Sequence, residues 1–158
     1  MGGGKKWIKA CKRNPLYRVL RCDKVTIGLL EETLRSYRSQ SFSKDNLALT
    51  MLTTSQIVLK NRGQKILDLL TKKIIKDLGI SRVNSEVEAG SGSLPEEKIE
   101  STALSFSPKK GKAKDLAKAF RCGSIPVVGY IQKNTFYIDL KAVLPSQIKR
   151  LSTAIQEV

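Results

Sequence analysis

The spacing of apolar residues changes near Gly79, and this change constrains the fold more than any other feature of the chain. Before Gly79, apolar residues recur at intervals of three and four, which is typical of amphipathic helices. After Gly79, apolar and polar residues alternate, which is typical of strands with one buried face. We therefore expect an α+β chain, with a basic helical arm over residues 1–79 and a small α+β domain over residues 80–158.

Within the helical arm, the spacing predicts a short helix over residues 5–13 and a longer one over residues 24–38. The second helix should bury one apolar stripe. That stripe consists of Ile27, Leu30, Leu34 and Tyr37. Residues 39–49 are expected to form a loop. Thr53 and Gln56 fit a capping box, which predicts the start of a long helix that Gly79 ends.

Residues 80–158 predict the order β-β-α-β-β-α, a four-stranded, mainly antiparallel sheet covered by helices on one face. The expected strands are 83–87, 102–106, 127–131 and 136–140, and the expected helices are 112–121 and a last one after Pro145. Asn134 suits a tight hairpin between the last two strands, because asparagine tolerates left-handed geometry. The glycine-rich segment 89–97 lacks the Lys-Ser/Thr pair of a nucleotide-binding loop, so a connector is favoured there.

The chain contains no histidine, which excludes Ser-His and Cys-His nucleophile pairs and histidine-ligated metals. Three cysteines without a CxxC motif, at positions 11, 22 and 122, indicate neither a disulfide framework nor a zinc site. We therefore expect reduced thiols and no bound metal. The sequence also lacks a signal-peptide core and a run of about 20 apolar residues that could span a bilayer, so we expect a cytoplasmic protein with no membrane partner.

Basic residues dominate the chain, which has a formal net charge of +15, and they are concentrated at its start. Residues 1–24 hold eight Lys or Arg residues and one acidic residue, a net charge of +7. Such a charge predicts a polyanionic partner, and tRNA contacts are expected at Lys5, Lys6, Lys9, Lys12 and Arg13. Trp7 among these lysines could stack on a base or anchor the helix on a neighbouring surface.

The stretch from Asn14 to Lys24 predicts an anion-binding site. Asn14 is a favourable N-cap, and Pro15 suits the first helical position after it. Asp23 can cap a second helix. Arg18 and Arg21 stand three residues apart, which places both guanidiniums on one side of the turn, near unpaired backbone N–H groups and the positive end of a helix dipole. Two solvated arginines of a basic surface are the alternative interpretation.

Several segments resemble the C-terminal portion of bacterial selenocysteine synthase, the L-seryl-tRNA(Sec) selenium transferase, a pyridoxal-phosphate enzyme of fold type I. The resemblance spans nearly the whole chain. It is carried by NPLYRVLRCDKVT (14–26), LEETL (30–34), MLT (51–53), GSGSLP (90–95), IPVVG (125–129) and YIDLKAV (137–143). Three positions depart from the family pattern, namely Ser91 for glycine, Tyr130 for arginine and Lys141 for arginine.

The resemblance implies a function that this chain would serve only in part. Arg18 and Arg21 match the arginines that hold the anionic donor, selenophosphate, in an enzyme that converts seryl-tRNA(Sec) to selenocysteinyl-tRNA(Sec). The family's large domain, with the lysine that binds pyridoxal phosphate, precedes the matched region. We therefore expect no cofactor on this chain alone, no independent activity, an upstream cofactor-domain partner and a ring-shaped homo-oligomer. A stand-alone RNA-binding module and a purely structural subunit-contact domain are the alternatives.

Overall fold

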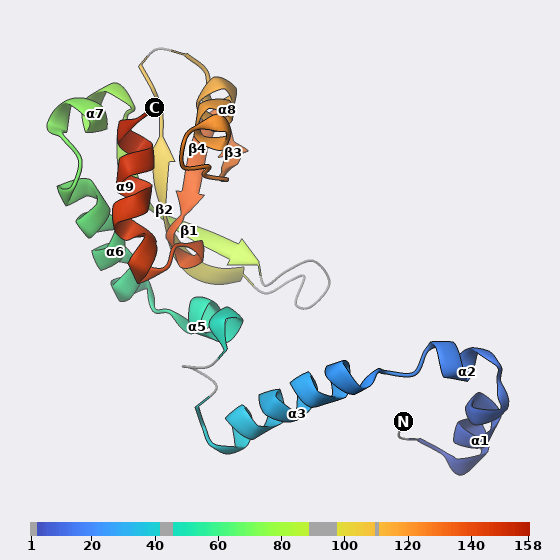
Figure 1. Cartoon of the computed structure of the whole chain (residues 1–158). Helices are drawn as coiled ribbons and strands as arrows, with labels where there is room; N and C mark the ends of the chain where they lie inside the picture. The colour runs from blue at the N-terminus through green and yellow to red at the C-terminus, as the bar shows by residue number, and fades with distance from the viewer. Residues whose placement is uncertain (1–2, 42–45, 89–97, 110) are drawn as a thin grey trace. The chain divides into compact units, whose positions relative to one another are not determined.

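A computed structural model describes residues 3–41, 46–88, 98–109 and 111–158 (Figure 1). The chain divides into two compact units, Met1–Leu47 and Ala48–Val158. It is an α+β protein, as the apolar spacing predicts. None of the described helices combines the length and apolar character that crossing a membrane requires.

The described part of the first unit contains the helices α1 (Lys5–Arg13), α2 (Leu16–Val19) and α3 (Lys24–Arg38). The predicted helices 5–13 and 24–38 are confirmed. The prediction that α3 buries its apolar stripe is wrong for this chain, because none of the three helices contains a buried residue. Ile27, Leu30, Leu34 and Tyr37 are between 48% and 60% exposed. The stripe has the period of a packed helix but nothing among the described residues covers it.

The next helices differ from the predicted long helix. Part of the expected loop is α5 (Leu47–Thr53), and Thr53 is its last residue rather than a cap. The Thr53 hydroxyl donates to the carbonyl oxygen of Leu49 at 2.7 Å. The helix α6 (Gln56–Asp68) begins after Ser55 instead. The capping-box prediction is therefore wrong, because the Thr53 side chain bonds backward into its own helix.

A break separates α6 from α7 (Lys72–Asp77), where one continuous helix was expected. Thr71 starts the second helix, and its hydroxyl accepts a hydrogen bond from the Ile74 amide at 3.3 Å. Gly79 ends it with a φ of +57°, as predicted. A Cβ at Gly79 would lie 2.1 Å from the carbonyl oxygen of Ser107, so the position requires glycine for both conformation and space.

The sheet has four strands in the order β1-β2-β4-β3, and all neighbouring strands are antiparallel. The strands are β1 (Ile80–Glu88), β2 (Lys98–Phe106), β3 (Tyr130–Gln132) and β4 (Thr135–Asp139). Lys133 and Asn134 form the predicted hairpin turn, with φ values of +47° and +60°. Both central residues are left-handed, which matches the twist of the flanking strands. The segment 89–97 lies outside the described residues.

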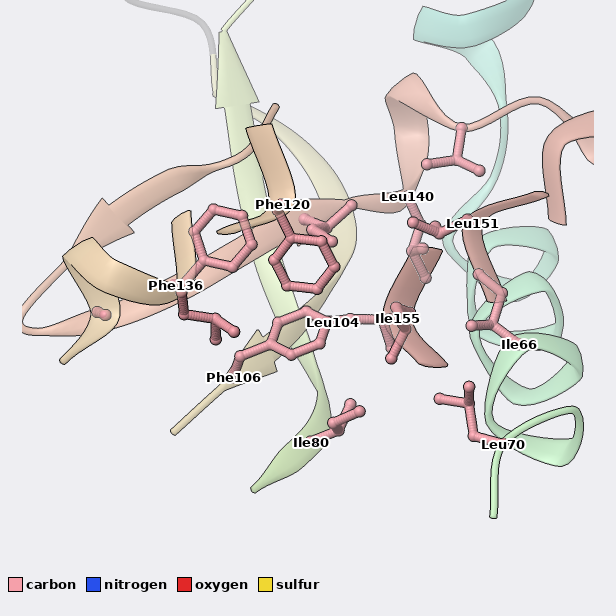
Figure 2. Close-up of a cluster of buried hydrophobic side chains, with 14 of the residues drawn as sticks. Ile66, Leu70, Ile80, Leu104, Phe106, Phe120, Phe136, Leu140, Leu151 and Ile155 are labelled. Atoms are coloured by element: carbon pink, nitrogen blue, oxygen red, sulfur yellow. The ribbon is translucent and has the colours of Figure 1, made fainter. Parts of the chain in front are cut away.

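One face of the sheet packs against α6, α8 (Ala113–Cys122) and α9 (Ile148–Gln156) to form the core (Figure 2). Short 3-10 turns, Leu140–Ala142 and Pro145–Gln147, lead into α9. The rings of Phe106, Phe120 and Phe136 form the centre, with centroids 5.2 to 5.7 Å apart. Fully buried rings of this kind contribute about 0.5–1.5 kcal/mol per pair beyond their burial.

The structural division between Leu47 and Ala48 differs from the boundary expected at residue 79. Leu59 and Ile66 of α6 are fully buried in the same core as the sheet residues. Gly63 allows this close packing, because a Cβ there would lie 2.9 Å from a methyl carbon of Leu140. The residues from 48 to 79 therefore pack with the sheet, although their helical period resembles that of the arm.

Candidate functional site

The turn between α1 and α3 is fixed by two polar side chains that the sequence predicts as caps. The Asn14 side-chain oxygen accepts a hydrogen bond from the Leu16 amide at 2.9 Å, and the Asn14 amide donates to the Cys11 carbonyl oxygen at 3.1 Å. Asn14 thus ends α1 and starts α2. Pro15 has the helical φ of −55° that this position needs.

Asp23 fixes the other end of the turn by capping α3. Its carboxylate accepts hydrogen bonds from the Thr26 amide at 2.8 Å and the Thr26 hydroxyl at 3.1 Å. The hydrogen bond from the Thr26 amide is the main cause that lowers the pKa of Asp23 below its ordinary value of 3.8. Because this carboxylate occupies the start of α3, and α2 has only four residues, the helix-dipole argument for anion binding loses its force.

Arg18 and Arg21 lie between these caps, Arg18 on α2 and Arg21 in the bend that follows it. Both side chains are exposed. Neither guanidinium has a hydrogen-bond or ion-pair partner within the described ranges, so both can bind an external anion. Arg21 lines a hollow between α1, α2 and the start of α3, with Tyr17 and Leu20 among its other walls. Arg18 is not among the residues that line it.

The helix α1 presents the basic residues predicted to contact tRNA. Lys5, Lys6, Lys9, Lys12 and Arg13 are all exposed. Trp7 is 70% exposed, and the Lys6 ammonium lies 5.7 Å from the centre of its ring. The helix therefore offers positive charge and one accessible aromatic face.

The sequence analysis did not predict that two cations of the second unit are buried, Arg62 and Lys141. The Arg62 guanidinium donates to the carbonyl oxygens of Leu140, at 2.8 Å, and of Val143. The Lys141 ammonium donates to the carbonyl oxygens of Leu52 and Thr54, both at 3.1 Å. Burial lowers the pKa of both cations, while the Asp139 carboxylate acts in the opposite direction on the pKa of Lys141. Each cation satisfies carbonyl oxygens at a chain turn, which is a structural role.

Asp139 joins three parts of the second unit. Its carboxylate accepts hydrogen bonds from the hydroxyls of Ser85, at 2.7 Å, and Ser101, at 2.6 Å, and from the Lys141 amide at 2.9 Å. Burial is the main cause that raises the pKa of Tyr130, and the negative charge of Asp139 adds to it. With its oxygens committed to these donors, Asp139 holds β1, β2 and the turn after β4 together.

The one buried lysine among the described residues does not fit pyridoxal phosphate. A lysine that carries this cofactor must present its amine to an open pocket. Lys141 is the only buried lysine in the ranges that the structure describes, and its ammonium is engaged with two backbone carbonyl oxygens. The same ranges contain no group of three or more cysteine or carboxylate side chains that could hold a metal ion. Cys11, Cys22 and Cys122 are exposed free thiols.

Comparison with known proteins identifies the family. The family model for L-seryl-tRNA selenium transferase matches residues 1–144. The L-seryl-tRNA(Sec) selenium transferase of Pasteurella multocida is 33% identical over 143 residues, covering 89% of this chain and 31% of that protein. The protein of the same name from Aquifex aeolicus is 29% identical over 156 residues, covering 99% of this chain and 34% of the relative. The chain thus spans about a third of the length of the curated relatives it matches, and it belongs to the L-seryl-tRNA selenium transferase family as a match to the C-terminal portion of those enzymes.

Proposed function

We propose that this chain binds the anionic selenium donor of an L-seryl-tRNA(Sec) selenium transferase through Arg18 and Arg21. In the proposed reaction, seryl-tRNA(Sec) becomes selenocysteinyl-tRNA(Sec), with selenophosphate as the donor. The observation that carries the proposal is a pair of guanidiniums that have no partner among the described residues, on a turn fixed by two caps, in a chain of this family. Guanidiniums bind tetrahedral oxyanions through forked, charge-assisted hydrogen bonds.

The chain is proposed to be inactive alone. Pyridoxal phosphate would supply the electron sink for replacing the seryl hydroxyl, and Lys141, the one buried lysine among the described residues, is not free to bind that cofactor. The matched relatives also carry sequence outside the matched region that is about twice as long as the matched region itself. Residues of this chain would bind and orient the donor anion, and a partner polypeptide would hold the cofactor.

We also propose that α1 contacts the tRNA. Its five basic side chains are exposed, its sequence contains no acidic residue, and Trp7 is available to a base. Positive charge of this density binds a phosphate backbone and releases counterions, so the affinity should fall steeply with salt. The same observation supports a second candidate function, a stand-alone RNA-binding module.

Binding of inorganic phosphate and of selenophosphate to the full chain tests the donor site. The double variant Arg18→Ala/Arg21→Ala should weaken selenophosphate binding at least about tenfold, because it removes two charge-assisted hydrogen-bond donors. The matched control is Arg35→Ala/Arg38→Ala, which removes two guanidiniums at the same spacing from the same unit. Equal losses in the two double variants would show a general charge effect and contradict the specific site.

A salt titration with tRNA and with a generic RNA single strand separates the two candidate functions. A tRNA contact in a selenium transferase should favour tRNA at salt concentrations where the single strand has dissociated. Equal affinities with equal salt dependence would favour the stand-alone module. The variant Lys5→Gln/Lys9→Gln should lower both affinities, and Lys72→Gln/Lys76→Gln on α7 provides the control for charge alone.

A further inference from the structure

The strand β1 forms a free edge of the sheet that the proposed function leaves unexplained. In the order β1-β2-β4-β3, no described strand lies on its outer side. It has nine residues, Ile80–Glu88, which is long for an edge strand. Hydrogen bonds to β2 engage only alternate residues of an antiparallel strand, so about half of the backbone groups of β1 point outward. Among the described residues, none of them bonds to a backbone group outside the sheet.

Neither a bulge nor a proline keeps this edge from pairing with another strand. The register between β1 and β2 is unbroken over all nine residues, and β1 contains no proline. Charged side chains are a further means of blocking an edge. The charged residues of β1 are Arg82, Glu86 and Glu88, and all three are exposed. Whether they prevent or favour pairing depends on which charges they would meet.

An antiparallel pairing of two β1 strands centred on Asn84 brings opposite charges together. All nine residues overlap in this register. Arg82 of each copy then lies opposite Glu86 of the other copy, and the two Asn84 side chains meet at the centre. Opposite charges directly across two strands stabilise the pairing, and asparagine side chains can donate to and accept from each other. An in-register parallel pairing would instead place each charge opposite the same charge.

The end of β1 that holds Glu86 has an excess of negative charge. Glu86 lies directly opposite Glu100 of β2, where like charges destabilise the pair. The ammonium of Lys98 lies 3.1 Å from the Glu86 carboxylate. The paired segments 86–88 and 98–100 together hold three acidic residues and one basic residue, a net charge of −2. This end of the edge therefore favours a cation from outside the copy.

The other end of β1 presents such a cation. The guanidinium of Arg82 donates to the carbonyl oxygen of Lys60 at 3.0 Å and to the side-chain oxygen of Gln64 at 3.2 Å. Neither acceptor is charged, so these bonds orient the guanidinium without neutralising it. The two ends of β1 are thus complementary in charge, which is the pattern that a two-fold symmetric interface requires.

The net charge of +15 does not prevent this contact. The strand β1 holds one basic and two acidic residues, a net charge of −1, so the basic excess of the chain lies elsewhere. At physiological ionic strength, exposed charges more than about 8 Å apart are largely screened. The charges that decide the pairing are therefore those on the two strands themselves.

We propose that β1 joins two copies of this chain edge to edge, with a two-fold axis at Asn84. The four strands of each copy then form one continuous sheet across the dimer. This inference is independent of donor binding and of RNA binding, because β1 belongs to the second unit and none of the residues proposed to bind those ligands lies on it.

Sedimentation velocity of the full chain tests the proposal. The parent chain should dimerise as its concentration rises. Arg82→Glu and Glu86→Arg should each weaken the dimer at least about tenfold, because each places two like-charge pairs across the joined strands. A one-to-one mixture of the two variants should restore the dimer, since one variant then carries only negative charges at positions 82 and 86 and the other only positive charges.

Two further variants make the test specific. Arg121→Glu reverses an exposed charge on α8, away from the edge, and should change the dimer affinity less than about twofold. Asn84→Asp places two carboxylates opposite each other at the centre, and this near-isosteric change should weaken the dimer even if a charge reversal unfolds the chain. Circular dichroism shows which variants are folded.

A monomeric parent chain would overturn the proposal. So would a dimer that survives both charge reversals and Asn84→Asp, or a mixture of the two folded reversal variants that stays monomeric. The measurements contain no phosphate, selenophosphate or RNA, so their outcome is separate from the tests of Arg18, Arg21 and α1.

Discussion

The guanidinium of Arg62 donates a hydrogen bond to the carbonyl oxygen of Leu140, 78 residues later in the chain, at 2.8 Å. It also donates to Val143, so one side chain of α6 satisfies two carbonyl oxygens of the turn before α9. Arg62 is only 8% exposed, and its charge is balanced by these oxygens rather than by a carboxylate. This arrangement ties α6 to the turn that precedes the last helix of the second unit.

Replacing Arg62 should therefore destabilise the second unit. Arg62→Met keeps the aliphatic stem but leaves two buried carbonyl oxygens without donors, and we expect a loss of about 2–3 kcal/mol in the free energy of unfolding. Urea unfolding followed by circular dichroism measures it. Arg121→Met, at an exposed position of α8, should change stability by less than about 0.5 kcal/mol. A similar small effect at Arg62 would contradict the structural role.

Lys141 should give the second unit a distinct alkaline pH dependence. Burial lowers the pKa of its ammonium below the ordinary value of 10.5, so between the lowered pKa and 10.5 the unfolded chain binds more protons at this position than the folded chain. The contribution of Lys141 to stability therefore rises with pH across that window. The difference in unfolding free energy between the parent chain and Lys141→Met should shift in favour of the parent as the pH approaches 10.5. A difference that is constant or moves the other way would refute this prediction.

Asp23 should make the start of α3 sensitive to acid. Its pKa is lowered from 3.8 in the folded chain, so the cap is complete above that value and is lost as the pH falls through the lowered pKa. Amide hydrogen exchange at Thr26 measures the loss, since that amide donates to the carboxylate. Asp23→Asn keeps a capping oxygen without the titration, and its Thr26 protection should stay constant between about pH 5 and pH 2. If Thr26 protection fell in the same way with pH in the parent chain and in Asp23→Asn, titration of the Asp23 cap would not be the cause of the loss.

Two glycine substitutions should have opposite outcomes. Gly79→Ala forces a left-handed residue against the Ser107 carbonyl oxygen and should cost more than about 2 kcal/mol in unfolding free energy. Gly28→Ala meets open space on α3 and should raise helicity, because alanine favours a helix interior over glycine by about 1 kcal/mol. Urea unfolding and circular dichroism report the two effects. Equal stability of the Gly79→Ala chain would show that the turn tolerates a side chain.

Features that depend on neighbouring residues were predictable from the sequence. The four strands, the Lys133-Asn134 hairpin and the caps at Asn14 and Asp23 all follow from local periodicity and turn chemistry, and the structure confirms that they exist. The third strand differs in its bounds, because it spans Tyr130–Gln132 where 127–131 was expected. The helix α5 was missed because its apolar run is short and carries no start signal. Thr53 was mistaken for a cap because its hydroxyl can bond forward or backward with the same local sequence.

Features that depend on distant residues were not predictable. The buried positions of Arg62 and Lys141 require carbonyl oxygens from residues 78 or more positions away, and no local pattern encodes such pairs. For the candidate site, the sequence located the turn and its two caps. The hollow beside that turn is defined only by the fold, and Arg21 lines it whereas Arg18 does not. The roles of both arginines remain predictions.

Every buried side chain in the described part of the protein lies at residue 59 or later. The melting temperature therefore reports on the phenylalanine-centred core, and substitutions in residues 3–41 should change it little. Variants selected for a higher melting temperature would accumulate changes in the second unit and could lose the function of the first without any sign in the screen. During evolution, selection on residues 3–41 would come from the molecules that they contact. Substitutions in these residues should therefore covary with substitutions in those molecules rather than with substitutions in the core of the second unit.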